Sequence, residues 1–337
     1  MKKILLLSTG GTIASVPSGE GLAPGLTGEK LLEGLSRPDI PFEVHCRELM
    51  SLDSSNLQPE HWSRMAEAVF SALPLCDGVV ISHGTDTMAY TAAALSFMLQ
   101  NLNKPVILTG SQLPMDAPES DGPKNLSDAL ACAADGRLHG VYIVFDGLVI
   151  RGVNARKTDT RKRHAFESVN AAPAGRLEKG RLFLNGEPKP PTGLPLTLNA
   201  NVSPGVLLMK LTPGASPALL EAAPGLGFRA VLLEAFGLGG IPGLDRSLLP
   251  SIHALSKQGI PVAVTSQCAF GDCDLSVYDV GVQAAKAGAL CAGPMLTETA
   301  IVKLSWILGQ TKDYRTMVRL FLENLAGEFD KNNENPI

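Results

Sequence analysis

Two threonines of this 337-residue chain stand next to glycines and follow short apolar segments. Thr12 comes after the run Ile4–Leu7, and Thr85 comes after the run Gly78–Ile81. Open α/β sheets bind their ligands at the carboxyl ends of the strands. Two hydroxyl groups delivered there from different strands can converge on one small substrate. Thr12 and Thr85 are therefore the first candidates for catalysis.

The glycines before Thr12 favour attack on a carbonyl group. Gly10 and Gly11 let the backbone approach a ligand closely and leave N–H groups that can stabilise an oxyanion. The Thr12 hydroxyl could then form a covalent acyl-enzyme; in the alternative, Thr12 only caps the next segment. The adjacent glycines do not fit the Gly-x-Gly-x-x-Gly pattern, and the P-loop pattern is absent, so we expect no nucleotide cofactor.

A threonine needs a neighbouring base to react, and Lys157 is the candidate for that role. Arg151 and Arg156 are its cationic neighbours in the sequence. A lysine held among apolar or cationic groups can act as a base. In the simpler alternatives, Lys157 belongs to a solvated basic loop, and Thr85 or Asp86 is the N-cap of the following helix.

The segment Asp53, Ser54 and Ser55 suits recognition of an α-amino acid. Hydroxyl and backbone N–H groups can hold a carboxylate, and an acidic side chain can hold an ammonium group. In the alternative, Asp53 is the N-cap of the following helix.

The elements that position these residues alternate between strands and helices, as in βαβ units with a parallel sheet. In the first half we expect strands at Ile4–Leu7, Glu43–Arg47, Val79–Ser82, Val106–Thr109 and Val141–Phe145, and helices at Pro59–Ala72, Thr87–Asn101 and Leu126–Ala134. In the second half we expect strands at Val206–Leu211, Ala230–Ala235, Pro261–Thr265 and Ala289–Ala292, and helices near Ser247–Lys257, Val277–Ala287, Thr297–Gly309 and Asp313–Ala326.

A proline-rich stretch between the two halves predicts two domains. Residues 185–204 lack periodicity, which is typical of a linker. We expect a catalytic α/β domain over residues 1–184, a linker over 185–204 and a smaller α/β domain over 205–330. The larger domain should have a parallel or mixed sheet flanked by helices. The polar tail 330–337 should be frayed.

Composition argues against several classes of protein. The net charge of -4 gives no reason to expect nucleic acid or an anionic membrane as a partner. No stretch reaches the roughly 20 apolar residues of a membrane span, and the first apolar run fits a strand better than a signal peptide. The six cysteines form no Cys-x-x-Cys pair, and the histidines show no zinc-ligand spacing. Free thiols predict a cytoplasmic location.

Taken in order, these segments resemble the bacterial-type L-asparaginases, a family that includes glutaminase-asparaginases. Its two signatures are similar to Thr-Gly-Gly-Thr-Ile-Ala, which ends at Ala14, and His-Gly-Thr-Asp-Thr-Met, which begins at His83. The similarity runs from Lys3 to about Leu325. The continuation Met-Ala-Tyr looks like the cytoplasmic type I branch. Further similar segments are Leu108–Pro114, Asp121–Leu126 and Lys157–Asp159.

The resemblance implies a two-domain fold, a homodimer or a tetramer of dimers, no cofactor, and hydrolysis of L-asparagine to L-aspartate and ammonia. It implies that Thr12 is the nucleophile and that Lys157 polarises Thr85. Asp86 would bind the ammonium group of the substrate.

The remaining site residues implied by the resemblance bind the substrate. The loop formed by Asp53, Ser54 and Ser55 would hold its carboxylate and ammonium groups, and Ser111 would lie near its side-chain amide. The glycines of the two signature loops, Gly11 and Gly84, would line the same site.

One departure from the family pattern concerns the activation of Thr12. Leu22 stands where relatives usually carry a tyrosine that is hydrogen-bonded to the nucleophile, and a leucine cannot take a proton. Either another group activates Thr12, or the segment from about residue 15 to 28 acts mainly as a lid that excludes water.

Two other departures concern the subunit interface and allostery. Gly240 stands where many relatives have an asparagine that reaches the neighbouring subunit's site. Glu234 and Arg156 replace the arginine and threonine of an allosteric asparagine site found in some type I enzymes, although Cys268 fits. We therefore do not expect that form of allostery.

Three alternative functions are open. A dual glutaminase-asparaginase differs little, because one methylene changes substrate discrimination by only about 1–3 kcal/mol. The amidase subunit of an archaeal-type tRNA amidotransferase carries an extra N-terminal domain, whereas the first signature here begins almost at Met1. A catalytically silent amino-acid-binding protein would explain Leu22.

Overall fold

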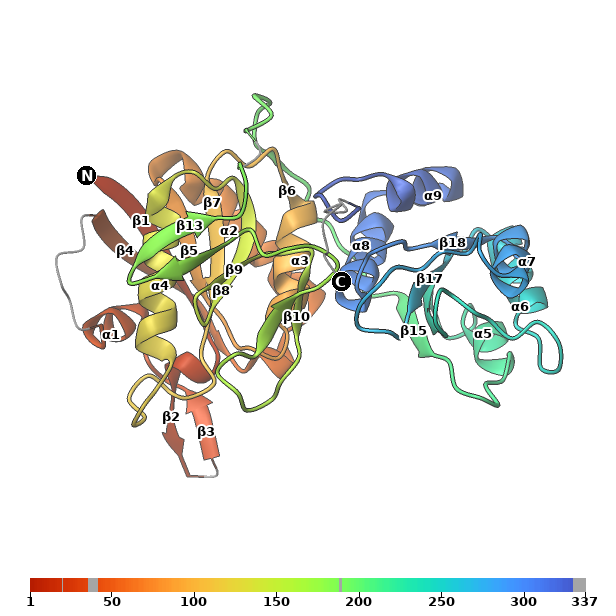
Figure 1. The fold of residues 1–337 in the computed structure, drawn as a ribbon, viewed down its shortest axis with the longest axis horizontal. Coiled ribbons are helices and arrows are strands. Elements are labelled where there is room, and N and C mark those ends of the chain that lie inside the picture. Colours follow the sequence, from red (N-terminus) through yellow and green to blue (C-terminus); the bar gives the residue numbers. More distant parts are fainter. Residues whose placement is uncertain (20, 36–41, 188–189, 330–337) are drawn as a thin grey trace. The chain divides into compact units, whose positions relative to one another are not determined.

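The computed structural model describes residues 1–19, 21–35, 42–187 and 190–329, and the chain forms two compact units (Figure 1). The first unit comprises Met1–Ser168 and Ala172–Ala200, and the second comprises Val169–Ala171 and the chain from Asn201 onward. Residues 188–189 of the expected linker and the tail 330–337 lie outside the described residues. The prediction of a two-domain α/β fold is confirmed.

The first unit is built on an eight-stranded mixed sheet in the order β13-β12-β9-β8-β7-β5-β1-β4. The five strands from β4 to β8 in this order run parallel. Each of them contains one of the segments in which the sequence predicted a strand. Their bounds are β1 Lys2–Gly10, β4 Phe42–Leu52, β5 Gly78–Ser82, β7 Pro105–Thr109 and β8 Gly140–Phe145.

The strand order reverses between β1 and β5. The chain moves outward from β1 to β4 and then returns to β5 on the other side of β1. In open α/β sheets, ligands bind in the crevice at such a reversal, outside the carboxyl ends of the strands. The loops that carry Thr12 and Thr85 leave the sheet on the two sides of this point.

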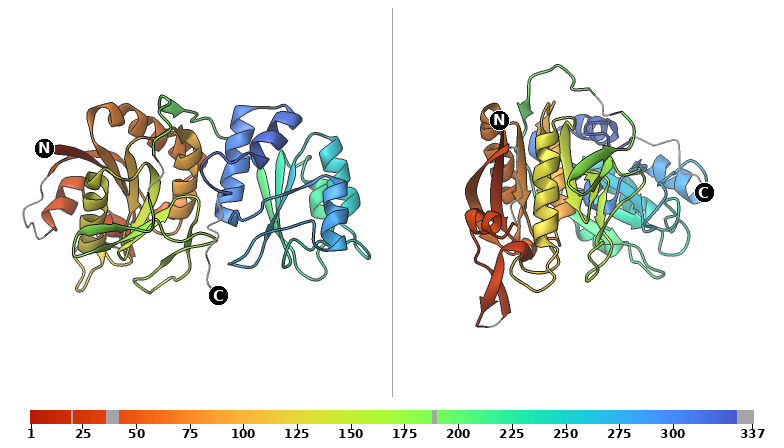
Figure 2. Two further views of the ribbon diagram at one scale, coloured as in Figure 1. Left: turned by 45° about the horizontal axis from the view of Figure 1, so that its top comes forward. Right: turned by 60° about the vertical axis from the view of Figure 1, so that its left-hand side comes forward.

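Helices cover the sheet (Figure 2). Helix α1 (Gly28–Glu33) and helix α4 (Gly122–Asp135) share one hydrophobic core with alternate residues of the parallel strands, such as Leu6 and Val80. Helix α2 (Pro59–Ala72) packs against α3 (Met88–Met98), which contacts β7 and β8. Helix α3 buries residues on all its sides, because the run Ala92–Leu95 has no polar face.

The sequence analysis did not predict the remaining strands of the first unit, which are only two to four residues long. An antiparallel extension of the main sheet consists of β9 (Leu148–Arg151), β12 (Gly175–Glu178) and β13 (Arg181–Leu184). A separate hairpin pairs β10 (Ala155–Lys157) with β11 (Phe166–Ser168). Lys157 is therefore the last residue of a strand rather than part of a solvated loop.

The expected helix Thr87–Asn101 is wrong at its end, since α3 stops at Met98. Residues Leu99–Gln100 form the short strand β6, which pairs with β14 (Thr197–Leu198). Asn101 has φ 62°, a left-handed conformation that a helix does not accommodate. The end of the proline-rich stretch thus hydrogen-bonds to the first unit.

The second unit has a four-stranded parallel sheet in the order β15-β16-β17-β18. Helices α5 to α7 supply Leu220, Ile252 and Ala284 to its core. Helix α8 contacts β15, β16 and β17. Figure 2 shows α8 and α9 on one face and α5 to α7 on the other. The bounds are β15 Val206–Lys210, β16 Ala230–Ala235, β17 Val262–Ser266, β18 Ala289–Cys291, α5 Ala218–Ala222, α6 Leu249–Lys257, α7 Asp279–Ala287, α8 Thr297–Gln310 and α9 Tyr314–Leu322.

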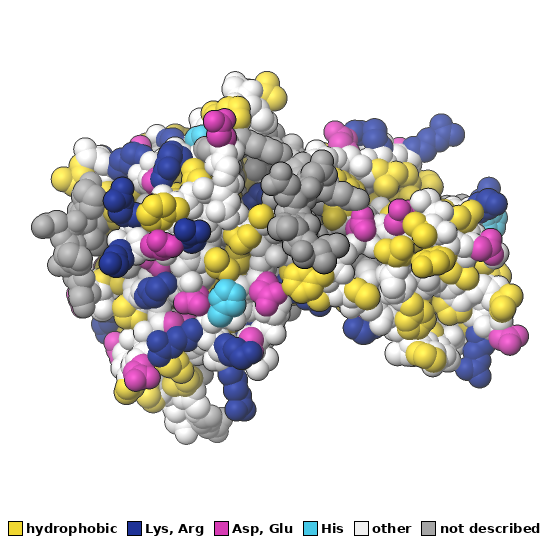
Figure 3. Space-filling view, in the orientation of Figure 1, with side chains coloured by type: hydrophobic (Ala, Val, Ile, Leu, Met, Phe, Trp, Pro, Cys, Tyr) yellow, Lys and Arg dark blue, Asp and Glu magenta, His cyan; other side chains and the backbone are white. Residues whose placement is uncertain are grey.

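The surface in Figure 3 mixes positive and negative side chains over the first unit, as expected for a chain with 29 Lys and Arg and 33 Asp and Glu residues. Within the described ranges, no helix is both long enough and apolar enough to span a bilayer.

Candidate active site

The two threonine loops lie in contact at the carboxyl edge of β1 and β5. Ser8 pairs with Ser82 in the register of the two strands, and the Thr9 hydroxyl donates to the Ser82 carbonyl at 2.7 Å. Gly11 has φ 80°, and a Cβ atom there would lie 2.3 Å from the Gly84 nitrogen. Only glycine fits so close an approach. The sequence expectation that the two loops converge is therefore met by the geometry of their backbones.

Thr12 is partly exposed and begins a single 3-10 turn, Thr12–Ala14. The Gly11 N–H group before it donates to the Leu52 carbonyl at 3.0 Å. Gly11 therefore cannot also offer that N–H group to an oxyanion, which corrects the expectation drawn from the adjacent glycines.

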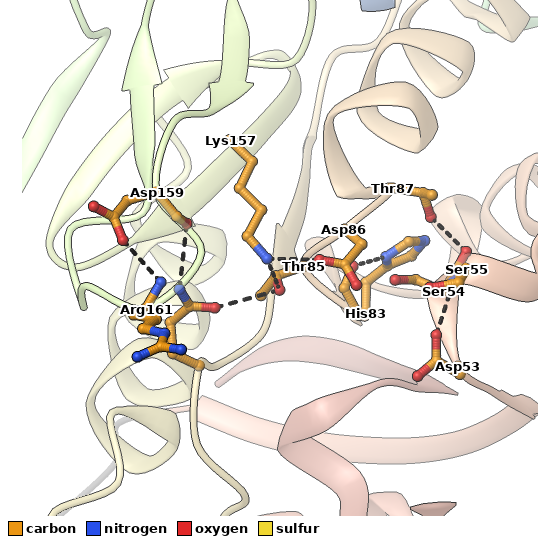
Figure 4. Close-up of polar contacts among 12 residues, drawn as sticks. Asp53, Ser54, Ser55, His83, Thr85, Asp86, Thr87, Lys157, Asp159 and Arg161 are labelled. Carbon is orange, nitrogen blue, oxygen red and sulfur yellow. Dashed lines mark hydrogen bonds and ion pairs between the residues drawn. The ribbon is translucent and has the colours of Figure 1, made fainter.

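Lys157 contacts two polar residues of the second loop (Figure 4). Its Nζ atom donates to Thr85 Oγ1 at 2.8 Å and to Asp86 Oδ1 at 2.7 Å. The Thr85 residue is 5 % exposed, whereas the Asp86 side chain is 62 % exposed. A hydroxyl that accepts from an ammonium group has its own proton directed elsewhere. The site therefore joins a buried hydroxyl, a lysine and an accessible carboxylate.

Gln112 is a site residue that the sequence motifs contain but do not single out. Its Oε1 atom accepts from the Thr85 hydroxyl at 3.5 Å. Its Nε2 atom donates to the backbone carbonyls of Asp159 at 3.4 Å and Lys162 at 3.1 Å. Gln112 thus links Thr85 to the loop that follows Lys157. The signal available was its position three residues after β7, at the same edge of the sheet.

Asp121 fixes the loop that carries Gln112. It is 6 % exposed, and its carboxylate accepts from the N–H groups of Gln112 at 2.9 Å and Leu113 at 3.1 Å. The Asn125 side-chain amide donates to Asp121 at 3.1 Å and to the Gly110 carbonyl at 3.0 Å. An aspartate just before a helix is expected to cap it, but this one does not cap α4.

His83 connects the second loop to helix α3. Its Nδ1 atom lies 2.7 Å from the Gly84 carbonyl and its Nε2 atom lies 2.9 Å from Thr91 Oγ1. The carbonyl can only accept, so Nδ1 carries the proton and Nε2 accepts from Thr91. Complete burial lowers the pKa of His83 to about 4, so the ring is neutral at physiological pH. The interpretation of His83 as a loop-orienting residue agrees with these contacts.

The segment after β4 borders the same loop. The Ser54 carbonyl accepts from Thr87 Oγ1 at 2.9 Å, and a Cβ on Gly84 would lie 2.6 Å from Ser54 Oγ. Asp53 accepts from the Ser55 N–H at 2.8 Å and caps the 3-10 turn Ser54–Asn56. Asp53 is therefore an N-cap, as the alternative interpretation predicted. The residue is also exposed, so its carboxylate remains accessible to solvent.

Two other expected residues differ in their surroundings. Ser111 is buried and donates its hydroxyl proton to the Leu113 carbonyl, so it stiffens its own loop. Leu22 lies in a hairpin of β2 (Ser15–Ser18) and β3 (Gly21–Pro24), where it pairs with Pro17 and is 57 % exposed. The expected lid is therefore a regular hairpin that follows Thr12 directly. Among the residues the structure describes, no three His, Cys, Asp or Glu side chains gather as a metal-binding group.

Comparisons with known proteins identify the family of the chain. Residues 3–190 match the family model for the N-terminal domain of asparaginase, and residues 205–321 match that for the glutaminase/asparaginase C-terminal domain. The chain is 38 % identical over 328 residues to an L-asparaginase of Thermococcus kodakarensis, which covers 97 % of this chain and 98 % of that protein. It is 37 % identical over 348 residues to a glutamyl-tRNA(Gln) amidotransferase subunit of Methanopyrus kandleri, covering 98 % of this chain and 75 % of the relative.

Solved structures show the same fold. The thermostable L-asparaginase of Thermococcus kodakarensis superposes with a TM-score of 0.91 at 37 % identity, covering 97 % of this chain and 98 % of that one. L-asparaginase I of Vibrio cholerae superposes with a TM-score of 0.85 at 32 % identity, with the same coverage of 97 % and 98 %. Both family models, the sequence identity and the shared fold lead to one conclusion: the chain belongs to the asparaginase family.

Proposed function

We propose that this protein is an L-asparaginase that hydrolyses L-asparagine to L-aspartate and ammonia through a threonine-bound acyl-enzyme. The observation that carries the proposal is the contact of Lys157 with Thr85 and Asp86, next to the loop that presents Thr12. Relatives named L-asparaginase that align over nearly their whole length support the choice of substrate.

In the first half of the reaction, Thr12 Oγ1 attacks the side-chain amide carbon of the substrate. The carbonyl oxygen becomes negatively charged and needs hydrogen-bond donors in place. Because the N–H group of Gly11 is bonded to Leu52, we assign this role to the N–H groups of Thr12 and Thr85. The amide nitrogen takes up a proton and leaves as ammonia, and the aspartyl group remains as an ester on Thr12.

In the second half, water attacks the aspartyl ester and releases L-aspartate. We assign Thr85 as a proton relay. In the first half it takes the proton of the Thr12 hydroxyl and passes its own proton to the leaving amide nitrogen. In the second half it takes a proton from the attacking water and passes one to Thr12 Oγ1. Lys157 donates to its oxygen and Gln112 accepts its proton, so the hydroxyl is held in one orientation. Such fixed geometry lowers the entropic part of the barrier. Leu22 has no basic atom and takes no part in proton transfer.

The substrate is held by its α-amino and α-carboxylate groups. Asp86 would bind the ammonium group, because its carboxylate is exposed and touches Lys157 through only one oxygen. The loop of Asp53, Ser54 and Ser55 would bind the carboxylate. Gly11 and Gly84 would line the site between this loop and Asp86. Ser111 would shape the region around the amide through its loop.

The remaining expectations are part of the same proposal. The protein would act as a homodimer or a dimer of dimers, without a cofactor, in the cytoplasm. The relative described as a probable cytoplasmic L-asparaginase of Campylobacter jejuni supports the location; it has a TM-score of 0.80 at 25 % identity.

The amidotransferase relatives define the main competing function. The glutamyl-tRNA(Gln) amidotransferase subunit of Pyrococcus abyssi is 36 % identical over 340 residues, which is 97 % of this chain and 77 % of that protein. A protein that works in this way would serve amidation of glutamyl-tRNA(Gln) rather than simple hydrolysis of asparagine.

The decisive experiment measures ammonia release by the purified protein from L-asparagine and L-glutamine. We expect turnover of L-asparagine, and a loss of about a thousandfold or more in both Thr12→Ala and Thr85→Val. Thr192→Val, an exposed residue of the first unit, is the matched control and should keep full activity. Acid quench during turnover should yield a peptide with one aspartyl group on Thr12.

Three results would contradict the proposal. Near-normal turnover in either threonine variant would remove that residue from the mechanism. A strong preference for L-glutamine would favour the amidotransferase or glutaminase function. Tight aspartate binding without any turnover would identify an amino-acid-binding protein.

A further inference from the structure

Two cysteines of the second unit lie next to one another, far apart from the threonine loops in sequence. Cys291 is the last residue of β18, and Cys273 lies in the loop that follows β17. The Cys291 thiol donates to the Cys273 carbonyl at 3.1 Å, and the Cys273 N–H donates to the Gly293 carbonyl at 2.9 Å. Each thiol also shifts the pKa of the other. Both are free cysteines in this structure.

The backbone around Cys273 fixes its sulfur. Cys273 is 3 % exposed. A Cβ atom on Gly239 would lie 2.8 Å from Cys273 Sγ and 2.7 Å from Leu275 Cδ2, so the sulfur packs directly against the backbone of Gly239. The Asp274 N–H donates to the Leu238 carbonyl at 2.8 Å and ties this loop to the same segment. The buried sulfur therefore has little freedom to move away from Cys291.

The two thiols differ in reactivity. Cys291 is partly exposed, and its pKa is lowered because the Cys273 thiol and the backbone N–H groups of Leu275 and Gly293 stabilise its thiolate. The pKa of Cys273 is raised, because the neighbouring Cys291 sulfur competes for its proton and burial disfavours its charged form. A thiolate is the form that reacts with peroxides and disulfides. The pair thus combines an accessible nucleophile with a buried partner thiol.

We propose that Cys273 and Cys291 are a redox modification site, which a peroxide converts reversibly into a disulfide between β18 and the loop after β17. In the first step the Cys291 thiolate attacks one peroxide oxygen; the O–O bond breaks, hydroxide leaves and Cys291 becomes a sulfenic acid. In the second step the Cys273 sulfur attacks the Cys291 sulfur, and the S–O bond breaks. Hydroxide leaves and combines with the thiol proton to form water. The two thiols lose two electrons, and the peroxide gains them.

The bond would cross-link segments that already meet around one residue. Asn170 donates to the carbonyls of Gly271 at 2.8 Å and Pro294 at 2.9 Å, and it accepts from the Gly271 N–H at 2.9 Å. These two partners flank Cys273 and Cys291 in the sequence. The loop and the end of β18 are therefore held together before oxidation, so a disulfide can form without a large backbone movement.

The test uses the full-length protein and hydrogen peroxide at a small molar excess. Thiols are counted in denaturant with a chromogenic disulfide reagent, and the linked peptides are identified by mass spectrometry without reduction. We expect the count to fall by two from the six cysteines of the chain, with one peptide pair that joins Cys273 to Cys291. A dithiol reductant should restore both thiols. The oxidised protein should also unfold at a temperature several degrees higher, since the loop closed by the bond is constrained in the unfolded state.

The matched control is Cys268→Ser, which removes an exposed thiol of the same loop. It should still lose two thiols and give the same peptide pair. Cys291→Ser should lose none, whereas Cys273→Ser should lose one thiol, as a sulfenic acid at Cys291, and form no disulfide. If a serine variant fails to fold, peptide mapping of the oxidised protein without substitutions still tests the proposal. Cross-linking of Cys268 instead, oxidation of Cys291 to a sulfinic acid without a disulfide, or six intact thiols after peroxide would overturn the proposal.

Discussion

The Nζ atom of Lys157 lies 2.8 Å from Thr85 Oγ1, although the two residues are 72 positions apart in the sequence. Lys157 ends β10, whereas Thr85 lies in the loop after β5. The lysine side chain is only 16 % exposed. The lysine thus holds a buried hydroxyl and a carboxylate within hydrogen-bond reach of one amine.

Replacement of Lys157 by methionine should abolish most of the activity. Lys157→Met keeps the length of the side chain but removes the donor to Thr85 and Asp86, so we expect a fall in kcat of roughly 10²–10⁴-fold. Steady-state ammonia release measures the effect. Lys162→Met is the control, because that lysine side chain is 78 % exposed and pairs with Asp159 rather than with Thr85 or Asp86. Equal activity of the two variants would contradict the assignment of Lys157.

Gln112 should influence the rate through the orientation of Thr85. Gln112→Leu removes the acceptor for the Thr85 proton and both donors to the loop after Lys157. We expect kcat to fall by about 10–100-fold, with a smaller change in KM, because misplacement of a reacting group affects the barrier more than binding. Gln283→Leu on the surface of α7 serves as the control. A change confined to KM would show that Gln112 binds substrate instead.

A side chain at Gly11 should destabilise the first unit. Gly11→Ala combines a positive φ of 80° with a Cβ atom 2.3 Å from the Gly84 nitrogen. Gly180→Ala isolates the first effect, because Gly180 has φ 72° and nothing lies within 4 Å of its added Cβ. The control should lower the free energy of unfolding by about 1–2 kcal/mol, and Gly11→Ala should lower it by about 3 kcal/mol or more. Urea unfolding compares the two; equal losses would show that the loops separate easily.

Acid should destabilise the protein through His83. Its pKa is about 4 in the folded protein against an ordinary histidine value of 6.5, so the unfolded state binds more protons between these values. The stabilising contribution is complete above pH 6.5 and is lost as the pH falls toward 4. At pH 5 the loss from this residue should be about 2 kcal/mol, at 1.36 kcal/mol for each pKa unit.

The comparison of unfolding at pH 7.5 and pH 5 isolates this effect. His83→Gln removes the titrating ring, so its free energy of unfolding should fall less than that of the unchanged protein by about the same 2 kcal/mol. NMR of the imidazole nitrogens provides an independent reading, since one ring should stay neutral through pH 5. A His83 ring that titrates near pH 6.5 would disprove its burial in this form.

The sequence by itself determined the fold class and supplied the candidate catalytic residues. The apolar runs at Ile4–Leu7 and Val79–Ser82 predict the strands β1 and β5, because a strand buried on both faces needs a continuous apolar segment. The types of residue at Thr12, Thr85 and Lys157 predict nucleophilic chemistry, because few side chains can supply a nucleophile or a base. The strands β9 to β13 escaped prediction, since each has only three or four residues and a short strand depends on its pairing partners more than on its own pattern.

Only the tertiary structure decided which of these residues meet. The placement of β1 between β4 and β5 brings the loops of Thr12 and Thr85 into contact, and strand order is a choice that no local pattern encodes. The same holds for other parts of the site. Tertiary packing places the hairpin that carries Lys157, joins Gln112 to Thr85, and pairs the Gly11 N–H group with the Leu52 carbonyl. A side chain's type is fixed by its residue, whereas its partners are selected by the packing of the whole chain.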